Sequence, residues 1–232
     1  MTVEHRLLPE TPYRNLDDYV AAGGGSGLEA LDRMGSTAAI SEIRASGLRG
    51  RGGAGFPTAI KLGGVASAAA DRKFVVANVS EGEPGTFKDR WMLQNNPYSL
   101  LEGITIAGMA VGAEQAFIGI KHKHHAAIDA LERAAVEMVD AGMIGQVPIT
   151  IVRGPDVYLF GEEKAMLEVI EGREAKPRLY PPYMNGLFEA VGDATEEAVL
   201  NSLFQAHTTV GRAGNRAEAI DLGEVRRVLS AR

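Results

Sequence analysis

Residues 73–90 read KFVVANVSEGEPGTFKDR. The first part, residues 73–79, is an apolar run rich in β-branched side chains, which is typical of a buried strand. The second part, residues 80–90, is polar and contains glycine and proline, which predicts a loop directly after that strand. Because ligands bind where loops leave the carboxyl ends of parallel strands, this loop is a candidate site.

Two more strand-like runs follow along the chain, at residues 115–120 and 147–152. Helical patterns separate the strands: residues 97–112 are mostly apolar, and residues 125–141 carry apolar side chains at helical spacing. Strands that alternate with helices predict a parallel sheet with helices on both faces. The predicted fold class is therefore α/β, with a Rossmann-like parallel sheet flanked by helices.

Flanking segments complete the predicted organisation. We expect the α/β domain to span residues 1–207 and to open with a turn-rich, helical lead-in over residues 1–36. A helix over residues 37–46 should end at Gly47, which can adopt the left-handed conformation common at helix ends. The C-terminal tail, residues 208–232, is expected to form a flexible link and a short terminal helix.

Composition excludes several classes of function. The chain has 232 residues, a net charge of −6 and no cysteine. It can therefore form neither a disulfide nor a cysteine-ligated iron–sulfur cluster, and its charge argues against nucleic acid as a partner. The most apolar run, residues 104–120, is interrupted by glycines and polar residues, so no membrane span is expected. The first residues lack the apolar core of a signal peptide, and we expect a cytoplasmic protein.

A glycine loop is the first candidate site. Residues 50–55 read GRGGAG, which matches the G-x-G-x-x-G pattern of loops whose backbone N–H groups bind phosphate. The cations of Arg49, Arg51 and Lys61 would favour an anion there. A predicted helix rather than a strand precedes the loop, unlike the dinucleotide-binding fingerprint. A glycine-rich surface turn is the alternative interpretation.

Two pairs of glutamates mark further candidates. Glu81 and Glu83 lie in the loop after the first strand, where carboxylates can accept hydrogen bonds from ribose hydroxyls or ring N–H groups. Glu162 and Glu163 follow Gly161 at the predicted start of a helix. Both pairs have structural alternatives, because acidic loops are common on surfaces and a helix dipole stabilises carboxylates in the first turn.

Three histidines follow the second strand, at positions 122, 124 and 125. Histidines this close together can bind a metal, but no set of carboxylates completes a site around them. We interpret the segment as a solvated helix start and expect no metal site.

Four segments resemble a known family in order and spacing. They are SGLRGRGGAGFPTAIK (46–61), NVSEGEPGTFKDR (78–90), YLFGEEKAMLEVIEG (158–172) and KPRLYPPYMNGLF (176–188). Each resembles a segment of the flavin-bearing subunit of NADH:quinone oxidoreductase, respiratory complex I. The same fold serves related NAD-reducing hydrogenases and formate dehydrogenases. The resemblance covers residues 37–205.

This resemblance implies an FMN-binding oxidoreductase subunit of the NADH dehydrogenase (diaphorase) type, which passes a hydride from NAD(P)H to flavin. It implies that FMN is held by the following residues: Gly50, Arg51, Gly52, Gly53, Lys61, Asn78, Glu81, Tyr158, Gly161, Glu162 and Glu163. Of these, Glu81 and Glu163 would serve the reaction itself. The substrate NADH would contact Phe56, Glu83 and Tyr183.

A partner is also implied, because the family's iron–sulfur domain has no counterpart in this sequence. Electrons would leave to an iron–sulfur or other electron-transfer subunit, or to a soluble acceptor.

Three departures from the family pattern keep alternatives open. Ser80 replaces an aspartate, residues 62–64 lack the family's aromatic rings, and residues 191–200 are acidic where the family carries asparagines near the flavin phosphate. One alternative is a non-catalytic relative that acts as a scaffold or regulatory subunit without flavin. Another is a module that binds a different nucleotide without redox chemistry.

Overall fold

The computed structural model describes residues 9–50, 55–177, 209–210 and 216–217. The chain divides into two units, Met1–Pro177 and Arg178–Arg232. In the second unit, β4 (Thr209–Val210) and β5 (Arg216–Ala217) pair as short antiparallel strands. Tyr183 and the predicted domain end at residue 207 lie outside the described residues.

A parallel sheet forms the centre of the first unit. Its strands are β1 (Phe74–Val79), β2 (Gln115–Lys121) and β3 (Ile149–Gly154), in the order β1-β2-β3. Asn78 of β1 lies opposite Gly119 of β2, so the register places the carboxyl ends of both strands at one edge. The parallel sheet confirms the predicted fold class. The third strand begins after Pro148, which has no N–H to donate to a ladder, rather than at residue 147 as predicted.

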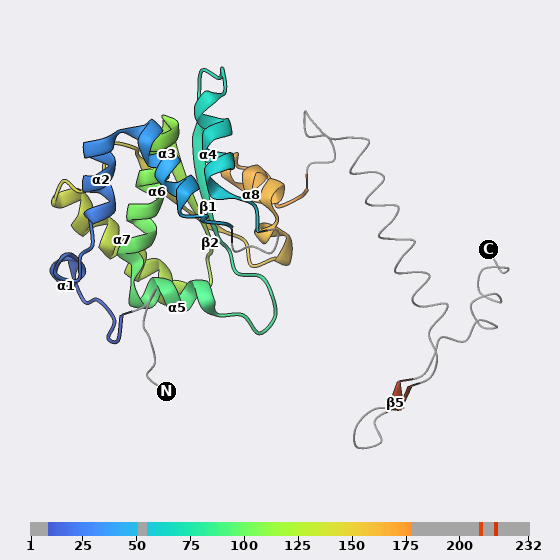
Figure 1. Ribbon diagram of the computed structural model, residues 1–232. Coiled ribbons are helices and arrows are strands. Elements are labelled where there is room, and N and C mark those ends of the chain that lie inside the picture. The colour runs from blue at the N-terminus through green and yellow to red at the C-terminus, as the bar shows by residue number, and fades with distance from the viewer. Residues whose placement is uncertain (1–8, 51–54, 178–208, 211–215, 218–232) are drawn as a thin grey trace. The chain divides into compact units, whose positions relative to one another are not determined.

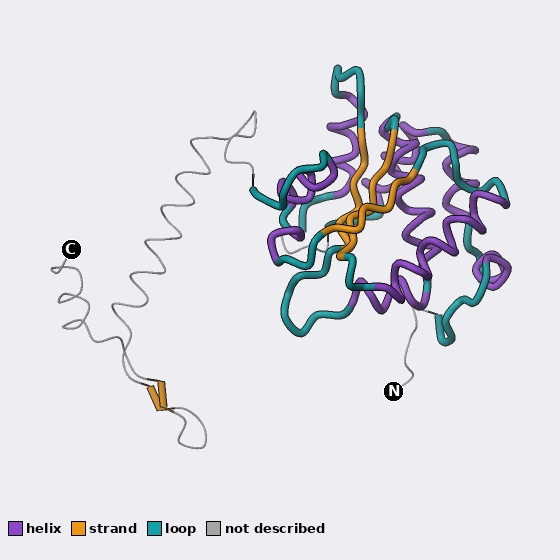
Figure 2. The backbone as a smooth tube through the Cα atoms, turned by 180° about the vertical axis from the view of Figure 1, so that it is seen from behind, coloured by secondary structure: helices purple, strands orange, loops and turns teal. Residues whose placement is uncertain are grey.

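Helices cover both faces of the sheet, as Figures 1 and 2 show. In the described part of the chain they are α1 (Leu16–Ala21), α2 (Ser26–Met34), α3 (Ser36–Ala45), α4 (Thr58–Ser67), α5 (Lys88–Asn95), α6 (Pro97–Val111), α7 (His125–Asp140), the 3₁₀ turn η1 (Tyr158–Gly161) and α8 (Glu163–Ile170). Helix α6 packs on β1 and β2 with α7 beside it, whereas α8 contacts β2 and β3. Among the described helices, none has the length and apolarity that a membrane crossing requires.

Successive residues of β2 point to opposite faces of the sheet. The side chains of Ala116, Ile118 and Ile120 are fully buried in the core beneath α6 and α7. On the other face, a Cβ at Gly119 would lie 2.5 Å from the sulfur of Met166 in α8. A Cβ at Gly154 would lie 2.1 Å from the Phe160 ring. Glycine at both positions therefore lets η1 and α8 lie directly on the sheet.

The lead-in is helical, with the glycines at 23–25 between α1 and α2. Helix α3 ends at Ala45, and Gly47 takes the expected left-handed conformation with φ of 68°. The prediction of a loop through residue 90 is wrong at its end, because α5 already begins at Lys88.

Candidate functional site

The loops that follow β1 and β3 meet at the carboxyl edge of the sheet. The side-chain amide of Asn78 donates to the carbonyl oxygen of Gly161 at 2.8 Å. The hydroxyl of Tyr158 donates to the Glu83 carboxylate at 2.6 Å. The structure therefore brings together two of the three predicted segments, although their paired residues lie 75 and 83 positions apart.

Ser80 is buried where these two loops contact each other. Its side chain is buried, and its hydroxyl donates to Oδ1 of Asn78 at 2.9 Å. A Cβ at Gly161 would lie 2.9 Å from the same hydroxyl oxygen, which is closer than a side-chain carbon normally comes. The small side chain of Ser80 and the bare backbone of Gly161 thus fit each other.

Glu81 is held by its own chain. Its φ is 39°, a left-handed backbone conformation that costs energy for a residue with a side chain. Its side chain is only 1% exposed, and its carboxylate accepts from the Asp89 N–H at 2.8 Å and from Nε of Arg90 at 2.7 Å. Burial alone would raise the pKa of this carboxyl, but the Asp89 N–H and the Arg90 guanidinium outweigh burial and lower the pKa.

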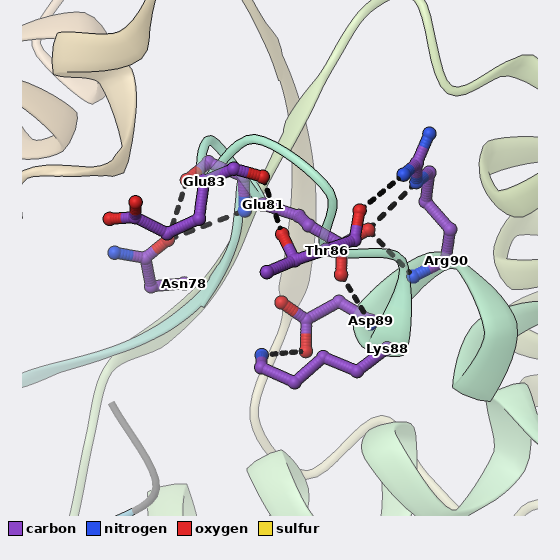
Figure 3. Close-up of polar contacts among 8 residues, drawn as sticks. Asn78, Glu81, Glu83, Thr86, Lys88, Asp89 and Arg90 are labelled. Carbon is purple, nitrogen blue, oxygen red and sulfur yellow. Dashed lines mark hydrogen bonds and ion pairs between the residues drawn. The ribbon is translucent and has the colours of Figure 1, made fainter. Parts of the chain in front are cut away.

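Further bonds close the loop after β1. Arg90 donates through Nη2 to the carbonyl oxygen of Thr86 at 2.6 Å. The Thr86 hydroxyl donates to the carbonyl oxygen of Glu83 at 2.8 Å. Figure 3 shows the result: the side chain of Glu81 turns toward Arg90 at the start of α5, and that of Glu83 turns to the opposite side.

Glu83 and Tyr158 form the exposed part of the site. Tyr158 is 61% exposed, and its hydrogen bond to the Glu83 carboxylate raises the pKa of its hydroxyl. Because this bond uses one carboxylate oxygen, the other acceptor positions of Glu83 can receive a ligand's hydroxyl or N–H.

The second glutamate pair lies at the start of α8. Glu162 is the N-cap residue, and its carboxylate accepts from the Ala165 N–H at 2.7 Å. Glu163 is the first residue of the helix and is exposed. Both glutamates therefore fit the structural alternative of acidic residues stabilised at the start of a helix, and Glu163 in addition presents its carboxylate at the surface.

The glycine loop is described at its base. The N–H of Gly50 donates to the Phe56 carbonyl oxygen at 2.9 Å, which closes the loop, while Arg51, Gly52 and Gly53 lie outside the described residues. Phe56 is 50% exposed, and Lys61 is exposed on α4. A pocket of about 230 Å³ adjoins this base and is lined by Ile43, Arg44, Gly47, Leu48, Arg49, Pro57, Ala59 and Ile60. A pocket at the amino ends of the strands, lined in part by Phe74 and Gln115, lies away from the predicted residues.

His124 corrects the interpretation of the histidine segment as solvated. The residue is 7% exposed, and its Nε2 has no hydrogen-bond partner within the described part of the chain. Burial, followed by the nearby charge of Arg90, lowers the pKa of its imidazole. His122 and His125 are exposed. The described residues contain no group of three or more His, Cys, Asp or Glu suited to a metal ion.

Lys121 was not predicted as part of the site. It is the last residue of β2 and is 4% exposed, and its ammonium lies 3.6 Å from a carboxylate oxygen of Asp156. The available signal in the sequence was a lysine directly after the apolar run 115–120, at the carboxyl end of a predicted central strand. Strand burial makes such a lysine unusual.

Comparisons with known proteins identify a family and related proteins. Residues 43–202, more than half of the chain, match the family described as the Nuo51 FMN-binding domain. An NADH-quinone oxidoreductase subunit of Rhizobium meliloti (strain 1021) is 41% identical over 177 residues, covering 72% of this chain and 42% of that protein. The mitochondrial NADH dehydrogenase [ubiquinone] flavoprotein 1 of Dictyostelium discoideum is 40% identical over 187 residues, covering 75% and 38%.

A solved structure shares the fold. The crystal structure of an NAD+-reducing [NiFe]-hydrogenase in the H2-reduced state aligns with a TM-score of 0.64 and 34% identity, over 74% of this chain and 30% of that chain. The chain thus spans about two fifths of the length of the curated relatives named above. From the family match and the shared fold, the chain belongs to the Nuo51 FMN-binding domain family.

Proposed function

We propose that this chain binds FMN at the carboxyl edge of its sheet and lets NAD(P)H deliver a hydride to it. The observation that carries the proposal is the joining of the two acidic loops, through Asn78 with Gly161 and through Glu83 with Tyr158. Family membership supports the choice of FMN, and the names of the relatives support NADH as the hydride donor.

The groups at this edge fit a flavin ring, which carries both hydrogen-bond donors and acceptors. The Tyr158 hydroxyl can donate or accept a hydrogen bond, and Lys121 supplies a positive charge next to Gly82. The phosphate would be held by Gly50, Arg51, Gly52, Gly53 and Lys61, as the family pattern implies.

A bound FMN would supply the two-electron acceptor that the side chains themselves lack. Within this proposal, the bonds of the Glu81 carboxylate to Asp89 and Arg90 fix the shape of the loop. The backbone of Glu81, rather than its carboxylate, would then face the cofactor. Glu83 and the exposed Glu163 would bind NADH, and the family pattern adds Phe56 and Tyr183 to the residues that contact it. The negative charge of the two glutamates favours the cationic nicotinamide ring that hydride loss leaves. Glu162 would hold the start of α8 in place, because its carboxylate caps that helix.

Electrons would then pass to a partner. The relatives are named as subunits of NADH-quinone oxidoreductase, which supports an iron–sulfur or other electron-transfer subunit as acceptor.

A second candidate function is a scaffold or regulatory subunit that keeps the fold without flavin. It is favoured by one observation: Asn78 and Glu81, both expected to contact FMN, already bond to the protein's own groups. FMN binding separates the two candidates.

The test compares two variants that each lose one amide side chain. Asn78→Ala breaks the bond between the loops, so we expect at least roughly tenfold weaker FMN binding, since misplaced site groups lose affinity steeply. Gln115→Ala removes an amide that bonds to Thr150 at the opposite end of the sheet, and should leave FMN affinity unchanged. Titration calorimetry with FMN gives both affinities. Equal affinities in the two variants would contradict the placement of the site.

A further inference from the structure

Lys121 carries a buried positive charge at the carboxyl end of the central strand. Its side chain is 5% exposed, and Nζ lies 3.6 Å from Oδ1 of Asp156. The same carboxylate oxygen lies 2.7 Å from Nζ of the half-exposed Lys123. Two ammonium groups therefore share one carboxylate, and the cluster of Lys121, Lys123 and Asp156 has a net charge of +1.

The buried ammonium lies against the loop that follows β1. A Cβ built on Gly82 would be 3.6 Å from Nζ of Lys121 and 3.4 Å from the ring of Tyr158. Lys121 thus lies on the side of Gly82 to which a side chain at that position would point. Gly82 is the residue between Glu81 and Glu83. The carboxylate of Glu81, in the same loop, is already compensated by Arg90 at 2.7 Å.

Burying Lys121 at this position costs folding free energy, which a purely structural role does not explain. A buried ammonium loses its hydration, and its ion pair at 3.6 Å is longer than a hydrogen bond between charged groups. An apolar side chain of similar length would fill the same space without that cost. In an interior of low dielectric, by contrast, a unit charge acts on other charges over several ångströms.

We propose that Lys121 raises the reduction potential of the bound flavin; this inference rests on the proposed function. NADH that gives up a hydride, two electrons with one proton, becomes NAD+, and the accepting ring system gains one negative charge. The ammonium beneath Gly82 favours that added charge by Coulomb attraction. Positive charge near the flavin ring is one of the means by which a protein tunes this cofactor.

Reduction potentials of bound FMN, measured by equilibration with a reference dye, test the inference. Lys121→Met should weaken binding of reduced relative to oxidised FMN by roughly tenfold, which lowers a two-electron potential by about 30 mV. Lys123→Met is the matched control: it removes an equal charge from the same Asp156 but at an exposed position, so its potential should stay close to that of the wild type. Lys121→Arg, which keeps the charge, should restore the potential.

Asp156→Asn is an independent test with the opposite expected result. It removes the carboxylate that compensates the Lys121 charge, so the reduction potential of bound FMN should rise. This test also decides the question if Lys121→Met does not fold. Failure of wild-type protein to bind FMN would overturn the proposed function. Normal FMN binding with unchanged potentials in both Lys121→Met and Asp156→Asn would overturn the role of Lys121 alone.

Discussion

Glu81 and Glu83 are separated by one residue but meet opposite surroundings. The left-handed backbone at Glu81 turns its carboxylate onto the N–H groups at the start of α5, where Arg90 completes its compensation. Glu83 stays exposed with the Tyr158 hydroxyl as its partner. One acid therefore shapes the loop, and the other remains available to a substrate.

That division leads to a kinetic prediction for Glu83. Glu83→Gln should raise the KM for NADH by roughly tenfold, because the charge that accepts substrate hydrogen bonds is lost. Affinity for FMN should remain within about twofold of the wild type, because the hydrogen bond from Asn78 to Gly161 still joins the two loops. Steady-state kinetics with ferricyanide as acceptor and an FMN titration give the two numbers. A large loss of FMN affinity with KM unchanged would assign Glu83 to the cofactor instead.

His124 predicts how stability depends on pH. Its pKa is lowered in the folded state, so above about pH 6.5 the imidazole is neutral in both states and adds no pH dependence. As pH falls below that value, the unfolded chain takes up a proton that the fold resists, and stability is lost by up to about 1.4 kcal/mol per pH unit until the folded pKa is passed.

Urea unfolding between pH 5 and 8 measures this effect. His124→Gln should flatten the acid side of the profile, whereas His125→Gln, at an exposed position, should leave the slope as in the wild type. A wild-type slope in His124→Gln would show that other groups cause the loss.

Among the elements, strands and long helices follow from local sequence. The β-branched run of β1 and the helical spacing of apolar residues in α7 are local patterns, and both elements lie within a few residues of the predictions. Helix α2 is different. Two N–H groups of its first turn, at Gly27 and Leu28, donate to the buried Glu102 carboxylate of α6, 75 and 74 residues away. Local sequence cannot show such a partner, which is why the lead-in is predicted only in outline.

Close packing of η1 on the sheet gives a prediction at Gly154. Gly154→Ala places a Cβ 2.1 Å from the Phe160 ring, so we expect a loss of about 1–3 kcal/mol in unfolding free energy from overpacking. Gly103→Ala is the control: it lies exposed within α6 with no atom within 4 Å of the new Cβ, and should stabilise the protein by about 0.5–1 kcal/mol. Urea unfolding compares the two. Equal stability of both variants would contradict the packing of η1 on the sheet.

In the whole molecule, motifs in the sequence identify the segments of the candidate site but not the contacts between them. The acidic loops are recognisable as NVSEGEPGTFKDR and YLFGEEKAMLEVIEG, and the parallel sheet explains why they meet. The burial of His124 and Lys121 and the internal bonds of Glu81 depend on residues from several elements. Such contacts become visible only once the chain is folded.

The carboxyl edge of the sheet and the glycine loop are together proposed to bind one flavin mononucleotide. Titration calorimetry of the purified wild-type chain with FMN, and separately with riboflavin, tests this most directly. We predict saturable binding of FMN at one site per chain and binding of riboflavin at least roughly a hundredfold weaker, because riboflavin lacks the phosphate that helix and loop N–H groups bind. Absence of FMN binding, or equal affinity for the two ligands, would contradict this assignment.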